Sequence, residues 1–158
     1  MMPTEVEDYL SLYELYWKFY TEALAALPAE GLNWRPPVAG EDGAAATNTA
    51  AVIAAHVSGG QRFWIGEAIG GLPAQRDRAA ELGLTAANGA QVIALVEAAA
   101  TVVRGVLRAQ TPADLERTVK FNDRDVTRRW LIVYILGHTA SHWGELMLVR
   151  QMWEATTR

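Results

Sequence analysis

The sequence predicts an all-α fold, a four-helix bundle, on three observations. Apolar side chains recur at helical spacing in four long segments. Alanine, the strongest helix former, is abundant throughout. Stretches that contain proline and glycine separate the segments. With 158 residues, of which 51% are hydrophobic, the chain has enough apolar surface for one core, so we expect a single domain, 1–158.

The first helical segment begins at a capping box of Thr4 and Glu7 and ends before Pro28. Its apolar stripe consists of Val6, Leu10, Tyr13, Trp17, Tyr20, Leu24 and Leu27. Four more apolar residues widen that stripe: Leu12, Leu15, Tyr16 and Phe19. Two interpretations remain open, a deeply packed helix and a homodimer interface.

The segment 29–46 is predicted to be a loop, since it contains Pro36, Pro37, Gly40 and Gly43. Either Thr47 or Asn48 is expected to cap the second helix, which ends at Gly70 and Gly71. The side of this helix that should face the bundle interior carries Val52, Ile53, His56 and Phe63.

A long connector separates the second and third helices. It has about 16 residues (72–87), whereas antiparallel neighbours usually need about 2 to 8. This length fits a crossover between parallel helices. The third helix begins near Asn88, ends before Thr111 and presents Val92, Ile93, Val96, Val103 and Leu107 on one side.

Thr111, Pro112 and Asp114 predict a short helical turn, and the stretch 118–126 around Asn122-Asp123 predicts a small hairpin. Thr127 is expected to cap the last helix, which runs to about Trp153. Its inner side is predicted to carry Leu131, Tyr134, His138, His142, Val149 and Met152.

Composition excludes several classes of protein. The net charge is −4 and the basic residues are scattered, so neither nucleic acid nor an anionic membrane is an expected partner. The acidic start lacks the pattern of a secretory signal, which makes the cytoplasm the expected location. The apolar tract 130–149 contains His138, His142 and Glu145, so it is expected to be a buried helix rather than a membrane span. There are no cysteines, so any thiol chemistry needs a thiol from outside.

The only three histidines predict a metal site. His138 and His142 are four residues apart on one helix, so they differ by about 40° and one turn and can share an ion. His56 is expected to face inward from another helix. Three imidazoles would leave a coordination position open, as in catalytic zinc sites. The alternative is that each is an ordinary hydrogen-bonded core histidine.

The residues beside the histidines exclude one class of zinc enzyme and add a candidate carboxylate to the site. A zinc protease of the H-E-x-x-H type needs Glu after the first histidine, where this chain has Thr139. Glu145 follows His142 by three residues and could orient a histidine, act as an acid or base, be a fourth ligand, or simply pair with an arginine. No cluster of cations is evident near the histidines in the sequence; Arg62, Arg128 and Arg150 are the candidates for contacting an anionic thiol.

A helix-two histidine followed by the GHTASHWGE segment resembles the DinB-like superfamily. The family pattern H-x-x-x-H-x-G-Q is matched by His138, His142 and Gly144, and LNWRP at 32–36 resembles the segment that the family carries after its first helix. Where the family commonly has glutamine, this chain has Glu145. The resemblance covers nearly the whole length and implies an up-down-down-up bundle with one divalent metal ion, often zinc or nickel, on His56, His138 and His142.

The resemblance also implies a function. Some members are thiol S-transferases or thiol-dependent isomerases that use a low-molecular-weight thiol such as bacillithiol or mycothiol, acting on a small-molecule substrate. A cation in the open position deprotonates a coordinating thiol, which gives a nucleophile at neutral pH. The same ligands would serve a metal-dependent hydrolase. The competing interpretation is a metal-binding or stress-associated bundle without turnover.

Overall fold

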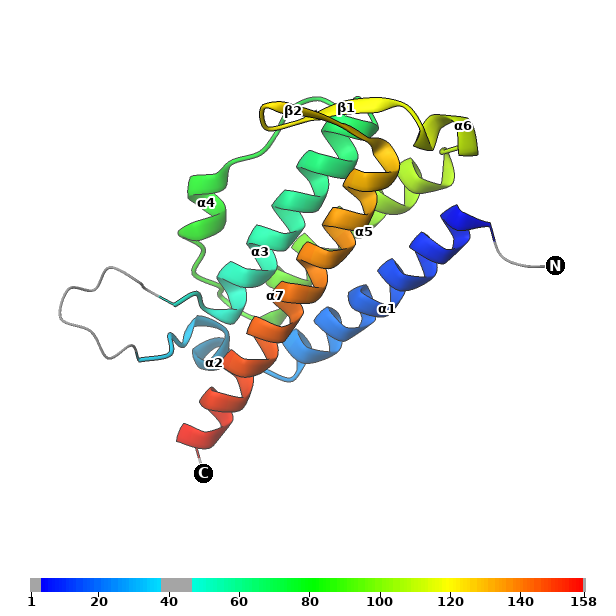
Figure 1. Ribbon diagram of the computed structural model, residues 1–158. Coiled ribbons are helices and arrows are strands. Elements are labelled where there is room, and N and C mark those ends of the chain that lie inside the picture. Colours follow the sequence, from blue (N-terminus) through cyan, green and yellow to red (C-terminus); the bar gives the residue numbers. More distant parts are fainter. Residues whose placement is uncertain (1–3, 38–46, 158) are drawn as a thin grey trace.

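The computed structural model describes residues 4–37 and 47–157, and the described chain is mostly helical with one small hairpin (Figure 1). Each of the helices α1 and α3 packs against both α5 and α7. The bounds of these four long helices are α1 Glu5–Ala25, α3 Ala50–Gln61, α5 Gly89–Arg108 and α7 Arg128–Thr156. The α3–α7 contact is the one that brings the histidines together.

Side-chain caps start these helices. The predicted capping box of Thr4 and Glu7 is confirmed, as are the predicted cap at Thr127 and the predicted start of the third helix near Asn88, whose side chain caps it. The predicted cap of the second helix is wrong by one or two positions, because Thr49 accepts the hydrogen bond from the Val52 amide. Thr47 is engaged elsewhere, since its hydroxyl donates to the Pro36 carbonyl.

The predicted loop 29–46 contains a helix that the sequence analysis missed, α2 (Ala29–Asn33). Leu32 is fully buried there, and the Asn33 side chain is hydrogen-bonded to the backbone of Ala86, so tertiary contacts hold this turn in place. The part of the loop prediction at 38–46 lies outside the described residues.

Beyond α3 the chain continues as a π-helix, η1 (Arg62–Ile69), which ends at Gly70. The connector that follows contains another short helix, α4 (Arg78–Leu82), capped by Asp77 and packed against α3. The predicted turn near Thr111 is confirmed as α6 (Pro112–Leu115) with its own capping box.

The predicted hairpin is confirmed as β1 (Thr118–Phe121) paired antiparallel with β2 (Arg124–Thr127). Asn122 takes up a positive φ of 51° at its tip, a conformation that asparagine tolerates better than most residues. The hairpin lies across the end of η1 and the start of α7 in Figure 1 and contacts both of them.

The predicted inner side of the last helix is partly wrong. The buried side chains of α7 are Leu131, Ile132, Ile135, Thr139, Leu146 and Val149. Tyr134 and Met152 are 39% and 37% exposed. The side of α7 that carries the histidines is therefore not the side that faces the core. His138 and His142 lie at the edge of the core-facing side and are half-buried.

The wide apolar surface of α1 is divided between two environments. Phe19 stacks on Trp143, with ring centroids 5.3 Å apart, whereas Leu12 and Leu15 are each 45% exposed. The homodimer interface therefore stays a prediction that concerns Leu12 and Leu15.

Helix α5 is long and apolar enough to cross a membrane by length and composition alone. One side of it, with Val92 and Val103, is buried against the other helices. This contact fits a core helix.

Candidate metal centre

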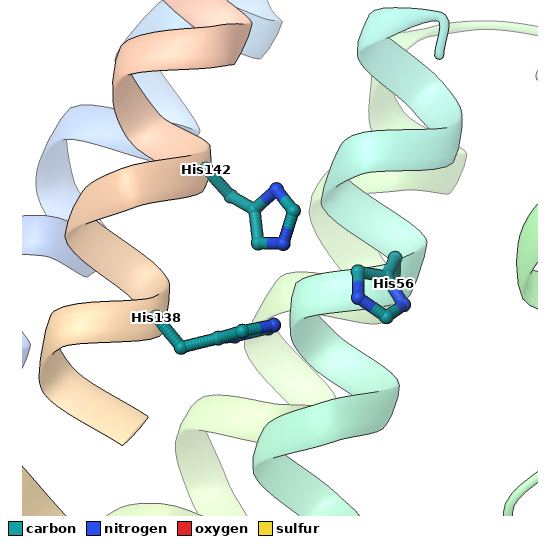
Figure 2. Close-up of side chains that lie close together, drawn as sticks. All are labelled: His56, His138 and His142. Atoms are coloured by element: carbon teal, nitrogen blue, oxygen red, sulfur yellow. The ribbon is translucent and has the colours of Figure 1, made fainter. Parts of the chain in front are cut away.

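Two neighbouring helices bring the three histidines together. His56 projects from the middle of α3, and His138 and His142 project from successive turns of α7 (Figure 2). The ring centroids of His138 and His142 are 4.5 Å apart, and those of His56 lie 5.1 Å from His142 and 5.4 Å from His138. One nitrogen of each ring lies within 4.8 Å of the other two. The predicted convergence of these rings is present in the structure.

The donor set fits a divalent metal ion. Zinc–imidazole bonds are about 2.0–2.1 Å long, which puts tetrahedral ligand nitrogens about 3.3 Å apart. A separation of 4.8 Å therefore has to shorten by about 1.5 Å, which side-chain rotation can supply. Nδ1 of His138 is buried and has no hydrogen-bond partner among the described residues. A buried polar atom without a partner is costly, and an ion or bound ligand would relieve that cost.

Two of the histidines, His56 and His138, are in the protonation state that a metal requires. Burial, with smaller contributions from the charges of His142 and His56, lowers the pKa of His138 to about 4. Burial likewise lowers the pKa of His56, although a hydrogen bond to Glu81 opposes the change. Both rings are therefore neutral at pH 7, with lone pairs free for coordination.

A carboxylate that the sequence analysis missed supports His56. Oε2 of Glu81, on α4, lies 3.3 Å from Nδ1 of His56. Arg76 donates two hydrogen bonds to the same carboxylate, at 2.9 and 3.0 Å. A Cβ atom at Gly59 would overlap this carboxylate, so the glycine makes its approach possible. A carboxylate on the far nitrogen of a histidine is the usual way to orient a metal ligand.

Glu145 supports a second histidine. Its Oε2 lies 2.7 Å from Nδ1 of His142, and its side chain is 50% exposed. This contact corresponds to the orienting role among those the sequence left open, while acid–base catalysis by Glu145 stays a prediction. Thr139, which stands where a zincin would have its general base, is buried on the core side and accepts a hydrogen bond from Gln61.

Comparison with known proteins identifies the family. The model of the DinB superfamily matches residues 12–146. The chain belongs to the DinB superfamily. This finding confirms the resemblance that the histidine pattern indicated.

The fold comparison agrees with the superfamily. The crystal structure of a conserved protein from Enterococcus faecalis is similar with a TM-score of 0.76, over 98% of this chain and 99% of that one. The two sequences are 13% identical, so this likeness concerns the fold alone. None of the curated protein sequences matches this chain.

In this DinB superfamily protein a hollow of about 670 Å³ adjoins the histidines, and we call it the histidine cavity. Its lining combines two histidines, three cations, four aromatic rings, a glycine near the end of α3 and an asparagine at the hairpin tip: His56, His138, Arg76, Arg78, Lys120, Phe63, Trp64, Phe121, Tyr134, Gly60 and Asn122. A cavity of this size holds a small organic molecule.

The cations of the histidine cavity are not the ones that the sequence suggested. Arg62 donates to Gln75, Arg128 donates to Gln110, and Arg150 pairs with Glu154. None of these three arginines lines the cavity. The connector supplies Arg76 and Arg78, and the hairpin supplies Lys120, because both segments fold back over α3 and α7.

Proposed function

We propose that this protein is a metal-dependent enzyme, a thiol S-transferase or thiol-dependent isomerase, with one zinc or nickel ion held by His56, His138 and His142. The observation that carries the proposal is the convergence of three imidazoles from two helices beside a cavity large enough for a small-molecule substrate. Three protein ligands leave a coordination position for that molecule.

A divalent ion, when bound, supplies a positive charge that lowers the pKa of a coordinating thiol, so that a thiolate is available at neutral pH. In the proposed transfer the sulfur forms a bond to an electrophilic carbon of the second substrate, and the leaving group departs with its bonding pair. The thiol proton goes to a base, for which Glu145 is the candidate in the chain, since its half-exposed carboxylate can pass the proton on to water.

The protein residues around the histidines have separate roles in this proposal. Glu81 and Glu145 orient two of the imidazoles through their Nδ1 atoms. The aromatic side chains of η1, β1 and α7 exclude water from one side of the cavity and offer an apolar surface to the substrate.

The experiment measures metal content and turnover on the same protein samples. Purified protein, the His138→Ala variant and a Gln151→Ala control, which changes an exposed residue of the same helix, are analysed for bound metal. Each is then assayed with monochlorobimane and several cellular thiols. We expect stoichiometric metal and thiol-dependent conjugation in the wild type and the control, and neither in His138→Ala.

Two results would contradict this function. Stoichiometric metal without turnover for any thiol would favour a metal-binding or stress-associated protein. Conjugation that persists in His138→Ala would separate the activity from the histidines.

The remaining expectations complete the proposal. We propose a single domain with the up-down-down-up order of α1, α3, α5 and α7, supported by the long connector before α5. A cytoplasmic location and a homodimer through the exposed Leu12 and Leu15 are likewise proposals, which cell fractionation and sedimentation test.

A further inference from the structure

The wall of the histidine cavity has an unbalanced charge. Arg76, Arg78 and Lys120 line it, and no aspartate or glutamate is part of this lining among the described residues. The chain as a whole has 18 acidic and 14 basic residues, so acids are the more frequent neighbours elsewhere. A cluster of cations without acids in one cavity raises the local positive potential and favours a negatively charged ligand.

Two of the three cations are available for a ligand. The Arg76 guanidinium is held by Glu81 through two hydrogen bonds, so its charge is largely neutralised. Arg78 is exposed and has no carboxylate within 4.0 Å in the part of the chain that the structure describes. Lys120 pairs with Asp125 across the hairpin at 2.9 Å, but both side chains are well exposed, at 71% and 61%. Such an ion pair is weak, and a ligand can compete for the lysine.

Aromatic rings form the apolar part of the cavity. Trp64 lies between Phe63 and Phe121, with ring centroids 4.6 and 4.8 Å away, and Tyr134 packs on Phe121 at 4.7 Å. These rings come from η1, β1 and α7, and all four belong to the lining of the cavity. An inorganic ion would leave this surface unused, so the lining fits a ligand with an apolar or aromatic portion.

We propose that the histidine cavity binds a small organic anion, whose carboxylate or phosphate pairs with Arg78 and Lys120 and whose apolar part packs on the aromatic rings. This inference rests on the proposed function, because it names the class of substrate or thiol for the same site. Arg78 lies in the connector and Lys120 in the hairpin, and neither is a proposed metal ligand. The preference for an anion therefore exists with or without a bound metal ion.

The test uses two ligands that differ in one charge and carry no free thiol. S-benzyl-N-acetylcysteine has a carboxylate and an aromatic ring, and its carboxamide is the neutral counterpart. Dissociation constants are measured by calorimetry or ligand-observed NMR, for zinc-loaded and for metal-free protein. Phenyl phosphate is titrated in parallel as an anion without a carboxylate.

Matched variants test whether Arg78 and Lys120 cause the preference for the acid over the amide. Arg78→Gln and Lys120→Gln remove one cavity charge each, while Arg108→Gln and Lys18→Gln remove one charge each from exposed positions outside the cavity. All four side chains are exposed, so the variants are expected to keep the fold, which thermal melting checks. We expect the acid to bind at least about tenfold more tightly than the amide, because a charge-assisted contact is stronger than a neutral one. Each cavity variant should lower that ratio several-fold, and the surface controls should leave it unchanged.

The outcomes separate this inference from the metal proposal. If the protein binds no metal but the acid preference persists and falls in Arg78→Gln, the anion site stands and the metal function fails. If the preference appears only with zinc and does not respond to Arg78 or Lys120, the ion alone selects the anion and the inference is overturned. Equal affinity for acid and amide, or no binding by either compound or by phenyl phosphate, also overturns it.

Discussion

The carboxylate of Glu81 lies 3.3 Å from Nδ1 of His56, although the two residues are 25 positions apart and belong to different helices. In the tautomer with its hydrogen on Nδ1, the imidazole donates to this carboxylate and keeps the Nε2 lone pair for a metal. The connector between η1 and α5 therefore does more than join two helices, because it supplies the group that orients a proposed ligand.

Glu81→Gln tests this relationship. The substitution keeps the shape of the side chain and removes its charge, so His56 loses its anionic partner. We expect zinc affinity to fall about 10- to 100-fold, the usual effect of removing such a partner. Competition with a chromophoric chelator measures the change, and Glu97→Gln, at an exposed site on α5, is the control. Equal zinc affinity in wild type and Glu81→Gln would remove Glu81 from the site.

Gly59→Ala tests the same Glu81 contact by steric overlap instead of by removal of its charge. The new methyl group would overlap Glu81, whose flexible side chain has to move away from His56. We expect a loss of zinc affinity similar to that of Glu81→Gln. Gly105→Ala is the matched control, since a Cβ there meets nothing within 4 Å, and in a helix interior it should stabilise the fold by about 0.5–1 kcal/mol. Unchanged affinity in Gly59→Ala would mean that the Glu81 contact is not needed.

Thr139→Val tests whether Thr139 contributes to the stability of the core and not to metal binding. The Thr139 hydroxyl accepts from the Gln61 amide and donates to the Ile135 carbonyl, and both Thr139 and Gln61 are buried. Valine leaves the Gln61 amide without this acceptor, which should lower the free energy of unfolding by about 1–3 kcal/mol. Chemical denaturation measures this loss, and zinc binding by the folded variant should be unchanged. A variant that keeps its stability but loses zinc would place Thr139 in the site instead.

The metal-free protein should lose stability as the pH falls from about 6.5 towards 4. Burial lowers the pKa of His138 from its usual 6.5 to about 4, so the unfolded chain binds a proton more readily than the folded chain in that range. The free energy of unfolding therefore decreases with falling pH. Urea denaturation of chelator-treated protein at several pH values measures this slope.

The control for the pH dependence is His138→Asn, which cannot titrate and should show a shallower slope. The informative quantity is the difference in slope between the two proteins, because carboxylates such as Glu14, whose pKa the hydrogen bond from Arg104 lowers, contribute equally to both. The same slope in both proteins would show that the burial of His138 does not determine this dependence.

The positions of the long helices followed from local rules. The capping box at Thr4, the caps at Asn88 and Thr127 and the turn at Asn122 each depend on residues within a few positions of one another, and all are present in the structure. Where local rules failed, a distant contact is present. Helix α2 is an example, because Leu32 is buried in the core and Asn33 binds the backbone of Ala86.

The sequence by itself determined the helical class of this protein and its three metal-ligand candidates, because helix periodicity and the i, i+4 spacing of His138 and His142 are local properties. Only the tertiary structure decided which groups surround those histidines. Glu81, Arg78 and Lys120 lie far from them along the chain, and they reach the site because α4 and the hairpin fold back over α3 and α7. Side-chain packing between distant segments determines such contacts, and no spacing along one helix encodes it.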